Sequence, residues 1–571
     1  MSRCVLFWLV SLSVVASLQA QTSTPGSTGN VPIFQSKVLV VLVDVVVTSG
    51  KGEAIPGLHQ EDFQVMEDGK PQIISSFEEH KGAPPTQVDL PSMPPNVYTN
   101  YPRIKTSDSV NVLLLDSLNT QPKDQVYVHA QVVKYLNHVR PGTRLAIFTL
   151  GSRLRMLKGV TADSSGLLAA IDPKKGGANP QFSRLLPTAF QKDTDKQLID
   201  VMIMNRAGPE AIDALRQYQA EESSSLIASR ALITLQALQQ LALYLSPIPG
   251  RKNVIWVSGS FPINIFPEAN RPHHYQGDIQ QTADMLTAGQ VAVYPIAAEG
   301  LRGDSLYDPG LFDPPSLEEE GAERAAHNIA MEKLAQDTGG RAFYNSNGLA
   351  DAVTHAINDG SRYYTLTYTP SDRKMDRKYR RIQVKLLTGK YNLAYRRGYY
   401  AEDAKAPEAA TQRQPADSLS TLMGFGLPDF SQIIYKVRVL AKDPRTATDT
   451  ALAGGNTDLQ GPLTRYGVDF AISIDDLKLD ETPDGMRHGS MHIMLIAYDR
   501  EGKPLNLVSQ KREILLHPKE YVALKEAGLQ VHQEIDVPKG DFYLRTGIYD
   551  LNSHHSGTLG VPLIGTSGLS Q

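Results

Sequence analysis

Hydrophobic and polar positions between residues 109 and 361 alternate in blocks that predict buried strands followed by amphipathic helices. Uninterrupted apolar runs predict strands, and apolar residues at intervals of three or four predict the intervening helices. Strands that alternate with helices favour parallel β-α-β units with right-handed crossovers. We therefore expect an α/β domain with a doubly wound, mostly parallel sheet. The strand-like runs are "NVLLLD" (111–116), "TRLAIFTL" (143–150), "KNVIWVSGS" (252–260) and "QVAVYPIAA" (290–298).

The segments on either side of this region have the period-2 alternation of half-buried strands. Residues 36–80 contain an Asp68-Gly69 pair between two strand-like runs, which is a strong hairpin signal. Residues 362–400 contain "YYTLTYT" and "RRIQVKL", which also alternate. A hairpin unit of this size buries too little surface to be stable alone. We therefore expect the two segments to pack together as a β-sandwich-like domain into which residues 109–361 are inserted.

The rest of the chain consists of a further strand-rich region and of segments without a regular pattern. Further strand-like runs over residues 426–552, separated by turn signals, predict a C-terminal all-β domain of the β-sandwich type. The segments between and after these domains are richer in proline or charge, or weakly patterned. We predict a Pro-rich connector at 81–108, a linker at 401–425 and a loose tail at 553–571.

The N-terminus has the pattern of an export signal. Arg3 precedes an apolar run from Val5 to Ala16, and the small residue Ala20 offers a cleavage site. We predict a signal peptide over 1–20 and a flexible Ser/Thr/Gly-rich leader over 21–35. A membrane anchor is the alternative, but the run is shorter than the roughly 20 apolar residues of a spanning helix. Cleavage would remove Cys4, the only cysteine, and with it any disulfide or thiol nucleophile. We expect a periplasmic, cell-envelope or secreted protein without a membrane span after cleavage.

Five motifs, in order, carry a resemblance to a known family. They are "LHQEDFQVMEDGKPQII", "VLLLDSLNT", "KNVIWVSGSFP", "YYTLTYTP" and "YRRIQVKL…YRRGYY", within residues 36–400. Together they resemble the VWFA-related domain family described from acidobacteria. The resemblance implies a von Willebrand factor type A-like fold, with a central mostly parallel sheet and helices on both faces. Such domains mostly bind proteins, often through a divalent metal at the carboxyl ends of the strands, where open α/β sheets generally bind ligands.

The resemblance also implies a metal site, and this chain departs from its pattern. The family's Asp-x-Ser-x-Ser places Asp116 first and puts Leu118 and Thr120 at the two serines. Ser258 stands where metal-binding relatives have an aspartate, and Thr188 is the candidate for a further threonine. Asp116, Thr120 and Ser258 are thus candidate ligands of a degenerate site for Mg²⁺ or another divalent cation.

A structural role for the same loop is the alternative to metal binding. Asp116 could cap backbone amides at the end of its strand. Thr120 could be the N-cap of the following helix, with Pro122 in the first turn.

Composition and motifs exclude several classes of function. The net charge of −4 comes without a basic stripe interleaved with aromatics, so nucleic acid is not an expected partner. "VSGSFP" lacks the glycines of a nucleophile elbow, and no dinucleotide fingerprint follows "VLLLD". We expect an exported, non-enzymatic binding or adhesion-type protein with a protein or cell-envelope partner, and no cofactor beyond a divalent ion. A cell-envelope hydrolase or other enzyme with an unrecognised site is the alternative.

Overall fold

The computed structural model describes most of the chain from residue 40 onward. The described residues are 40–82, 93–101, 109–171, 198–199, 201–248, 250–261, 276–298, 317–344, 348–374, 376, 378–401, 415–446, 452–459, 461–500 and 502–563. The predicted signal peptide and leader therefore lie outside the described residues, as does Thr188.

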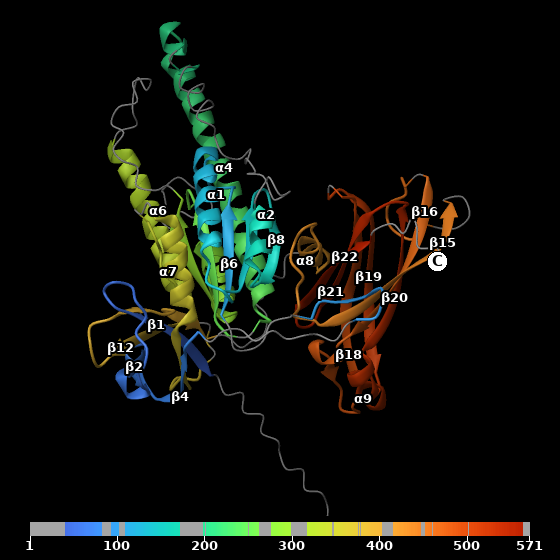
Figure 1. The fold of residues 1–571 in the computed structure, drawn as a ribbon. Helices are drawn as coiled ribbons and strands as arrows, with labels where there is room; N and C mark the ends of the chain where they lie inside the picture. Colours follow the sequence, from blue (N-terminus) through green and yellow to red (C-terminus); the bar gives the residue numbers. More distant parts are fainter. Residues whose placement is uncertain are drawn as a thin grey trace, which may run out of the picture. The chain divides into compact units, whose positions relative to one another are not determined.

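A five-stranded sheet forms the centre of the region 109–361, in the order β10-β9-β6-β7-β8 (Figure 1). Neighbouring strands are parallel except for β8, which runs antiparallel to β7 at one edge. Every residue of β9 is buried, as expected for a strand covered on both faces. The predicted doubly wound, mostly parallel sheet is confirmed. The strands are β6 (Val110–Asp116), β7 (Leu145–Leu150), β8 (Leu154–Thr161), β9 (Lys252–Ser258) and β10 (Val291–Ala297).

Helices cover both faces of this sheet. Leu114 and Trp256 point to one face and share a hydrophobic cluster with α4, α5 and α6. Leu113 and Ile255, their neighbours along the strands, point to the other face and pack with α1, α2 and α7. This alternation follows from the period-2 geometry of a strand. The helices are α1 (Pro122–Asn137), α2 (Ser164–Ile171), α4 (Pro209–Leu245), α5 (Gln276–Ala288), α6 (Leu317–Thr338) and α7 (Leu349–Ser361).

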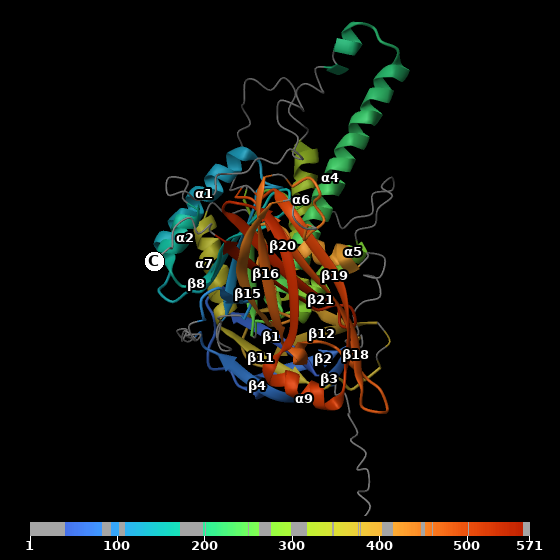
Figure 2. The same cartoon turned by 90° about the vertical axis from the view of Figure 1, so that its right-hand side faces the viewer.

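Helix α4 is much longer than the strands it covers, and Figures 1 and 2 show its N-terminal half running past the end of the sheet. Among the described residues, the stretch Ser225–Leu245 within α4 is the one helix long and apolar enough to cross a membrane. Its Leu235, Leu238 and Leu241 side chains are buried in the cluster beneath the sheet. Their burial gives the apolar composition of this stretch a role in the core of the domain.

The segments that flank this domain pair with each other. Strand β1 lies antiparallel to β11, with Val41 opposite Tyr368, and β2 lies antiparallel to β12, with Val65 opposite Val384. The buried Glu67 accepts hydrogen bonds from the hydroxyls of Tyr368 (2.7 Å) and Tyr399 (2.9 Å). The two sheets have the orders β13-β1-β11-β4 and β14-β12-β2-β3.

The bounds of these flanking strands are as follows. The first sheet contains β1 (Val41–Thr48), β4 (Ile74–His80), β11 (Tyr363–Tyr368) and β13 (Asn392–Ala394). The second contains β2 (Phe63–Glu67), β3 (Lys70–Gln72), β12 (Tyr379–Leu386) and β14 (Gly398–Tyr400), and a short 3-10 helix, η1 (Gln60–Asp62), precedes β2. Asp68 and Gly69 both have positive φ in the tight turn between β2 and β3, where the sequence predicts a hairpin.

Residues 435–563, whose last strand is β22 (Ser556–Leu563), form two further antiparallel sheets together with β5 (Val97–Thr99), and the inner residues of these sheets share one hydrophobic cluster. The first has the order β20-β16-β15-β5, and the second contains β17, β18, β19, β21 and β22. Their elements are β15 (Tyr435–Thr446), β16 (Pro462–Ile472), η4 (Ile474–Asp476), β17 (Asp480–Glu481), β18 (Arg487–Tyr498), β19 (Pro504–Leu516), α9 (Pro518–Ala527), β20 (Leu529–Pro538) and β21 (Phe542–Asp550).

Three segments predicted to be irregular contain regular elements. Strand β5 (Val97–Thr99), inside the predicted connector, pairs with β15. Helix α8 (Pro415–Leu422) lies inside the predicted linker and buries Leu419 against β18 and β21. Strand β22 (Ser556–Leu563), inside the predicted tail, pairs with β21 and buries Leu559 and Val561. Strand β5 and helix α8 are short and are stabilised by partners distant in the sequence, whereas β22 pairs with the strand that directly precedes it.

Candidate functional site

The candidate site surrounds Asp116, the last residue of the central strand β6. Its strand lies between β7 and β9, so the carboxyl end of β6 is enclosed by the loops that follow those strands. Asp116 itself is buried, with 3% of its surface exposed. An aspartate at such a position must have its charge compensated by neighbouring groups, because burying an unpaired carboxylate costs several kcal/mol.

Four hydrogen-bond donors supply that compensation. Oδ2 of Asp116 accepts from Nδ2 of Asn119 (2.8 Å), Nε1 of Trp256 (3.0 Å) and Oγ of Ser258 (2.8 Å). Oδ1 accepts from the backbone N–H of Asn119 at 3.0 Å. Burial raises the pKa of Asp116, and the hydrogen bonds from Asn119, Ser258 and Trp256 act in the opposite direction. Asp116 is thus held by donors from its own loop and from β9.

The donors around Asp116 are themselves fixed by second contacts. Asn119 Nδ2 also donates to Oγ1 of Thr234 on α4 at 2.9 Å. Ser258 Oγ lies 2.7 Å from the carbonyl oxygen of Ser260 as well as beside the carboxylate. The loop after β6 is therefore tied to α4 and to the end of β9, and its geometry is set before any ligand arrives.

The three predicted ligand residues lie close together, although their oxygens have other partners. Ser258 Oγ is bonded to Asp116, and Oγ1 of Thr120 accepts the backbone N–H of Gly259 at 2.9 Å. Gly259 lets the two loops approach closely, since a Cβ at this position would lie 3.0 Å from the Cα of Thr120. Leu118, at a serine position of the family pattern, is fully buried in the hydrophobic cluster.

The N-terminus of α1 differs in one respect from the predicted helix cap. Helix α1 begins with Pro122 at its first position, as predicted, but its N-cap residue is Gln121 and no side chain caps it. The prediction that Thr120 is the N-cap is wrong, because its hydroxyl is engaged by the β9 loop instead. Asp116 does accept a backbone amide at the end of its strand, that of Asn119.

The residues present do not fit a divalent cation. Mg²⁺ needs a nearly complete shell of oxygen ligands with free lone pairs. Here three donors occupy one carboxylate oxygen, one of them an indole N–H, which can only donate. Within the described part of the chain, no cluster of three or more His, Cys, Asp or Glu side chains could hold a metal. Metal binding at Asp116, Thr120 and Ser258 therefore stays a prediction, and the geometry does not support it.

A cavity of about 50 Å³ opens beside this loop, and we call it the Asp116 cavity. It lies on the α1 and α2 side of the sheet. Polar groups come from the β6 loop, from Gln125 and His129 of α1 and from Thr149 of β7, and apolar side chains complete its walls. The lining residues are Leu115, Asp116, Ser117, Thr120, Gln125, Val128, His129, Thr149, Leu157, Ile171 and Val257.

Two of the residues that line this cavity were not recognised from the sequence. Gln125 donates through Nε2 to the carbonyl oxygens of Ser117 (3.2 Å) and Thr120 (2.9 Å). Nε2 of His129 lies 2.9 Å from the carbonyl oxygen of Ile171. Both residues lie in a segment whose apolar spacing predicts only a helix. A polar residue on the inner side of such a helix was the only available signal.

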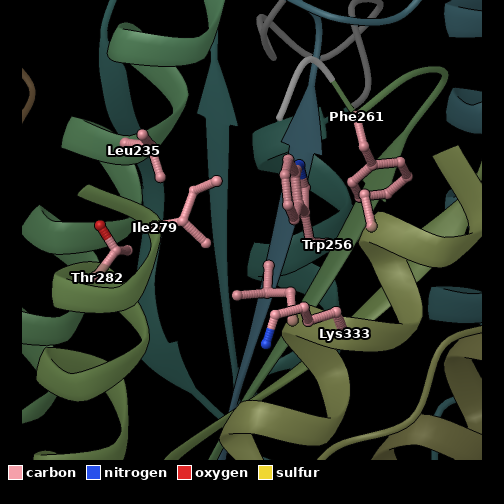
Figure 3. A pocket seen from close by; sticks show the side chains of 8 residues that line it. Leu235, Trp256, Phe261, Ile279, Thr282 and Lys333 are labelled. Atoms are coloured by element: carbon pink, nitrogen blue, oxygen red, sulfur yellow. The ribbon is translucent and has the colours of Figure 1, made fainter. Parts of the chain in front are cut away.

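A second, apolar cavity of about 10 Å³ lies on the opposite side of the sheet, among β9, α4, α5 and α6. Figure 3 shows Trp256 beside Phe261, with Leu235 and Ile279 across from them. The two rings are in edge contact, with centroids 4.6 Å apart. Trp256 thus packs its ring in an apolar setting while its N–H holds Asp116. This explains how one polar atom of a core residue becomes part of the site.

Comparisons with known proteins give structural likenesses only. No family model matches the chain, and no curated protein matches it. The solved structures it resembles include an aerotolerance-related membrane protein from Bacteroides fragilis (13% identity, 44% of this chain and 98% of that one, TM-score 0.23). A second is a von Willebrand factor type A protein from Catenulispora acidiphila (11% identity, 64% of this chain and 85% of that one, TM-score 0.23). A third is the manganese-loaded TRAP protein from Plasmodium vivax (11% identity, 52% of this chain and 94% of that one, TM-score 0.21).

Likenesses with TM-scores this low carry no argument about function. The fold is instead described by its own strand order and by the helices on both faces of the sheet. That arrangement agrees with the one that the sequence resemblance implies.

Proposed function

We propose that this chain is an exported, non-enzymatic binding protein that contacts a protein or cell-envelope partner through the carboxyl edge of its central sheet. We further propose that it does so without a bound divalent ion. The observation that carries the proposal is the state of Asp116, a carboxylate placed at the binding edge of an open α/β sheet. Its charge is compensated by N–H and O–H donors of the chain itself.

The arrangement of reactive groups favours binding over catalysis. Ser258 Oγ lies 2.8 Å from Asp116, which would resemble an activated hydroxyl. However, Ser258 has no exposed surface, so a substrate could not reach it. His129 is engaged by the carbonyl oxygen of Ile171 through Nε2. Among the described residues of the cavity, neither the carboxylate nor the imidazole is bonded to an accessible hydroxyl.

Site-specific photo-crosslinking in the native host tests the proposal. A benzoylphenylalanine at Val126, which is 62% exposed on the second turn of α1, would lie near the proposed contact edge. The matched control is Val522, which is 67% exposed on α9. We expect a discrete cross-linked product in the envelope or periplasmic fraction from position 126 only, unchanged by EDTA. Equal products from both positions, or none from either, would refute the proposed contact edge, and loss of the product in EDTA would refute metal-free binding.

A further inference from the structure

Among the described residues, the helices over one face of the central sheet leave part of that face uncovered. Leu115 is the one residue of β6 that is not fully buried, and Thr149 is the one such residue of β7. The two lie side by side in the register of these parallel strands. Strands covered on both faces are normally buried throughout. The Asp116 cavity is therefore a gap between α1 and α2 that reaches the sheet, with Leu115, Thr149 and Leu157 at its floor.

The larger polar side chains that line the cavity are held by other parts of the chain. Asp116 is buried and is bonded to Trp256, whose ring packs on the opposite face of the sheet. The amide of Gln125 donates to two carbonyl oxygens of the β6 loop. Nε2 of His129 is engaged by the carbonyl oxygen of Ile171. The surface that a ligand could touch is therefore mostly apolar.

The chemistry of this surface favours an uncharged aliphatic group. Accessible aliphatic surface remains at Leu115 and Leu157, both half-buried, and Ser117 and Thr149 add neutral hydroxyl groups. In the part of the chain that the structure describes, no lysine or arginine lines the cavity, and the acid that does so is the buried Asp116. A charged group would lose its hydration here without gaining an ion-pair partner. An aliphatic group instead gains free energy with the apolar area that it removes from water.

The volume of the cavity limits the size of that group. About 10–15 Å³ holds one water-sized group, so the 50 Å³ of the cavity accommodates about four heavy atoms. The isobutyl side chain of leucine matches this size, whereas the benzyl side chain of phenylalanine exceeds it. A small branched aliphatic group is thus the best fit.

We propose that the Asp116 cavity binds a branched aliphatic group, the leucine side chain of a partner protein. This inference rests on the proposed function and specifies the chemistry of its contact. The cavity is continuous with the proposed contact edge, because it lies at the carboxyl ends of β6 and β7. Leu115 and Thr149 retain exposed surface, so an incoming side chain can reach them. A single buried aliphatic anchor of this kind is typical of the centre of a protein interface.

The first test is methyl NMR spectroscopy of the purified exported protein with labelled leucine methyl groups. The probe is N-acetyl-leucinamide, and its matched controls are N-acetyl-glycinamide and N-acetyl-lysinamide. We expect saturable shifts at Leu115 and Leu157 and none at Leu507, which is 41% exposed on β19. The leucine probe should bind about 10- to 100-fold more tightly than the glycine probe. Equal binding of the glycine or lysine probe would overturn the proposal. So would the absence of a saturable shift with any probe, which would indicate that another segment of this chain fills the cavity.

Two substitutions at one position give the second test. Thr149→Phe places a larger apolar side chain at the floor of the cavity, so it should weaken binding of the leucine probe by about tenfold or more. Thr149→Val keeps the size of the side chain and removes only the hydroxyl, so it should retain binding. The matched control is Thr367→Phe at a half-buried position of β11, which should leave binding unchanged. Circular dichroism confirms that each variant is folded. Full binding by folded Thr149→Phe, or loss of binding in folded Thr149→Val, would overturn the assignment.

The same variants separate this inference from the proposed function. If a partner leucine occupies the cavity, Thr149→Phe should suppress the cross-link formed from position 126, and Thr149→Val should not. A cross-link that persists in Thr149→Phe would refute the leucine assignment while leaving the proposed function in place. Probe binding without any cross-link from position 126 would refute the proposed function, and with it the partner as the source of the aliphatic group.

Discussion

Removing the Asp116 carboxylate tests whether hydrogen bonds from the chain compensate its charge. In Asp116→Ala, two of the four donors keep a second partner. Asn119 Nδ2 retains Thr234, and Ser258 Oγ retains the carbonyl oxygen of Ser260. Nε1 of Trp256 and the backbone N–H of Asn119 lose the acceptor that they have here.

The expected loss in free energy of unfolding follows from those two donors. Each buried donor left without a partner costs about 1–3 kcal/mol, which gives about 2–6 kcal/mol in total. Relief of the burial penalty on the ionised carboxylate reduces this cost at neutral pH. We therefore expect the free energy of unfolding to fall by about 2–4 kcal/mol at pH 7.

The free energy of unfolding that Asp116→Ala loses depends on pH, and the direction of this dependence can be derived. The pKa of Asp116 is raised in the folded protein above the ordinary value of 3.8. Between the two values the folded protein binds more protons than the unfolded chain, so this group's contribution to stability falls as pH rises. The contribution is fully present below pH 3.8 and absent in Asp116→Ala. The cost of the substitution should therefore be larger at pH 4 than at pH 7, since other carboxyl groups cancel in the comparison.

Urea unfolding of the protein without residues 1–20, which removes Trp8, can be followed by Trp256 emission, and this emission reports on the sheet domain because Trp256 is buried in its core. Asp124→Ala is the matched control: it removes a carboxyl group from the first turn of α1, one of whose oxygens is buried without a partner, and should cost less than about 1 kcal/mol. A cost below about 0.5 kcal/mol for Asp116→Ala, or one that grows with pH, would refute the role assigned to the four donors.

Two further predictions concern metal binding and the C-terminal sheets. Calorimetric titration of Mg²⁺ and Mn²⁺ should give flat traces for the wild-type protein and for Asp116→Ala; saturable heat lost in the variant would instead show a metal at Asp116. Arg545→Met should cost about 3–5 kcal/mol in calorimetric unfolding, because fully buried Arg545 pairs with Asp429 at 2.7 Å and donates to the carbonyl oxygens of Leu422, Leu427 and Pro428. Arg438→Met, which breaks an exposed pair with Asp469, should cost less than about 1 kcal/mol, and equal costs would contradict this reasoning.

Much of the central sheet could be predicted because its strands are continuous apolar runs. A strand covered on both faces needs no polar alternation, so "NVLLLD" and "KNVIWVS" stand out from the amphipathic helices between them. The residues at the ends of these strands could also be brought together, since parallel strands end at the same edge of a sheet. The family resemblance grouped Asp116 with Ser258 at this edge, and their oxygens are in hydrogen-bond contact.

The partners of Asp116 within the sheet could not be predicted in the same way. Trp256 lies inside an apolar run, and nothing local indicates that its N–H faces a carboxylate. That contact depends on the register of β6 and β9, which places Leu114 opposite Trp256. Gln125 was hidden for a similar reason, because its role depends on the path of the loop before α1. Strand β5 has three residues and is specified by its pairing with β15, far away in the sequence.

The chemistry of the Asp116 loop explains why a binding edge could persist without a metal. A divalent ion would hold the loop by drawing oxygens toward itself, and its loss would leave a buried carboxylate uncompensated. In this chain the indole of Trp256, the amide of Asn119 and the hydroxyl of Ser258 perform that structural task. The proposed metal-free contact edge therefore relies on hydrogen bonds that the chain itself supplies.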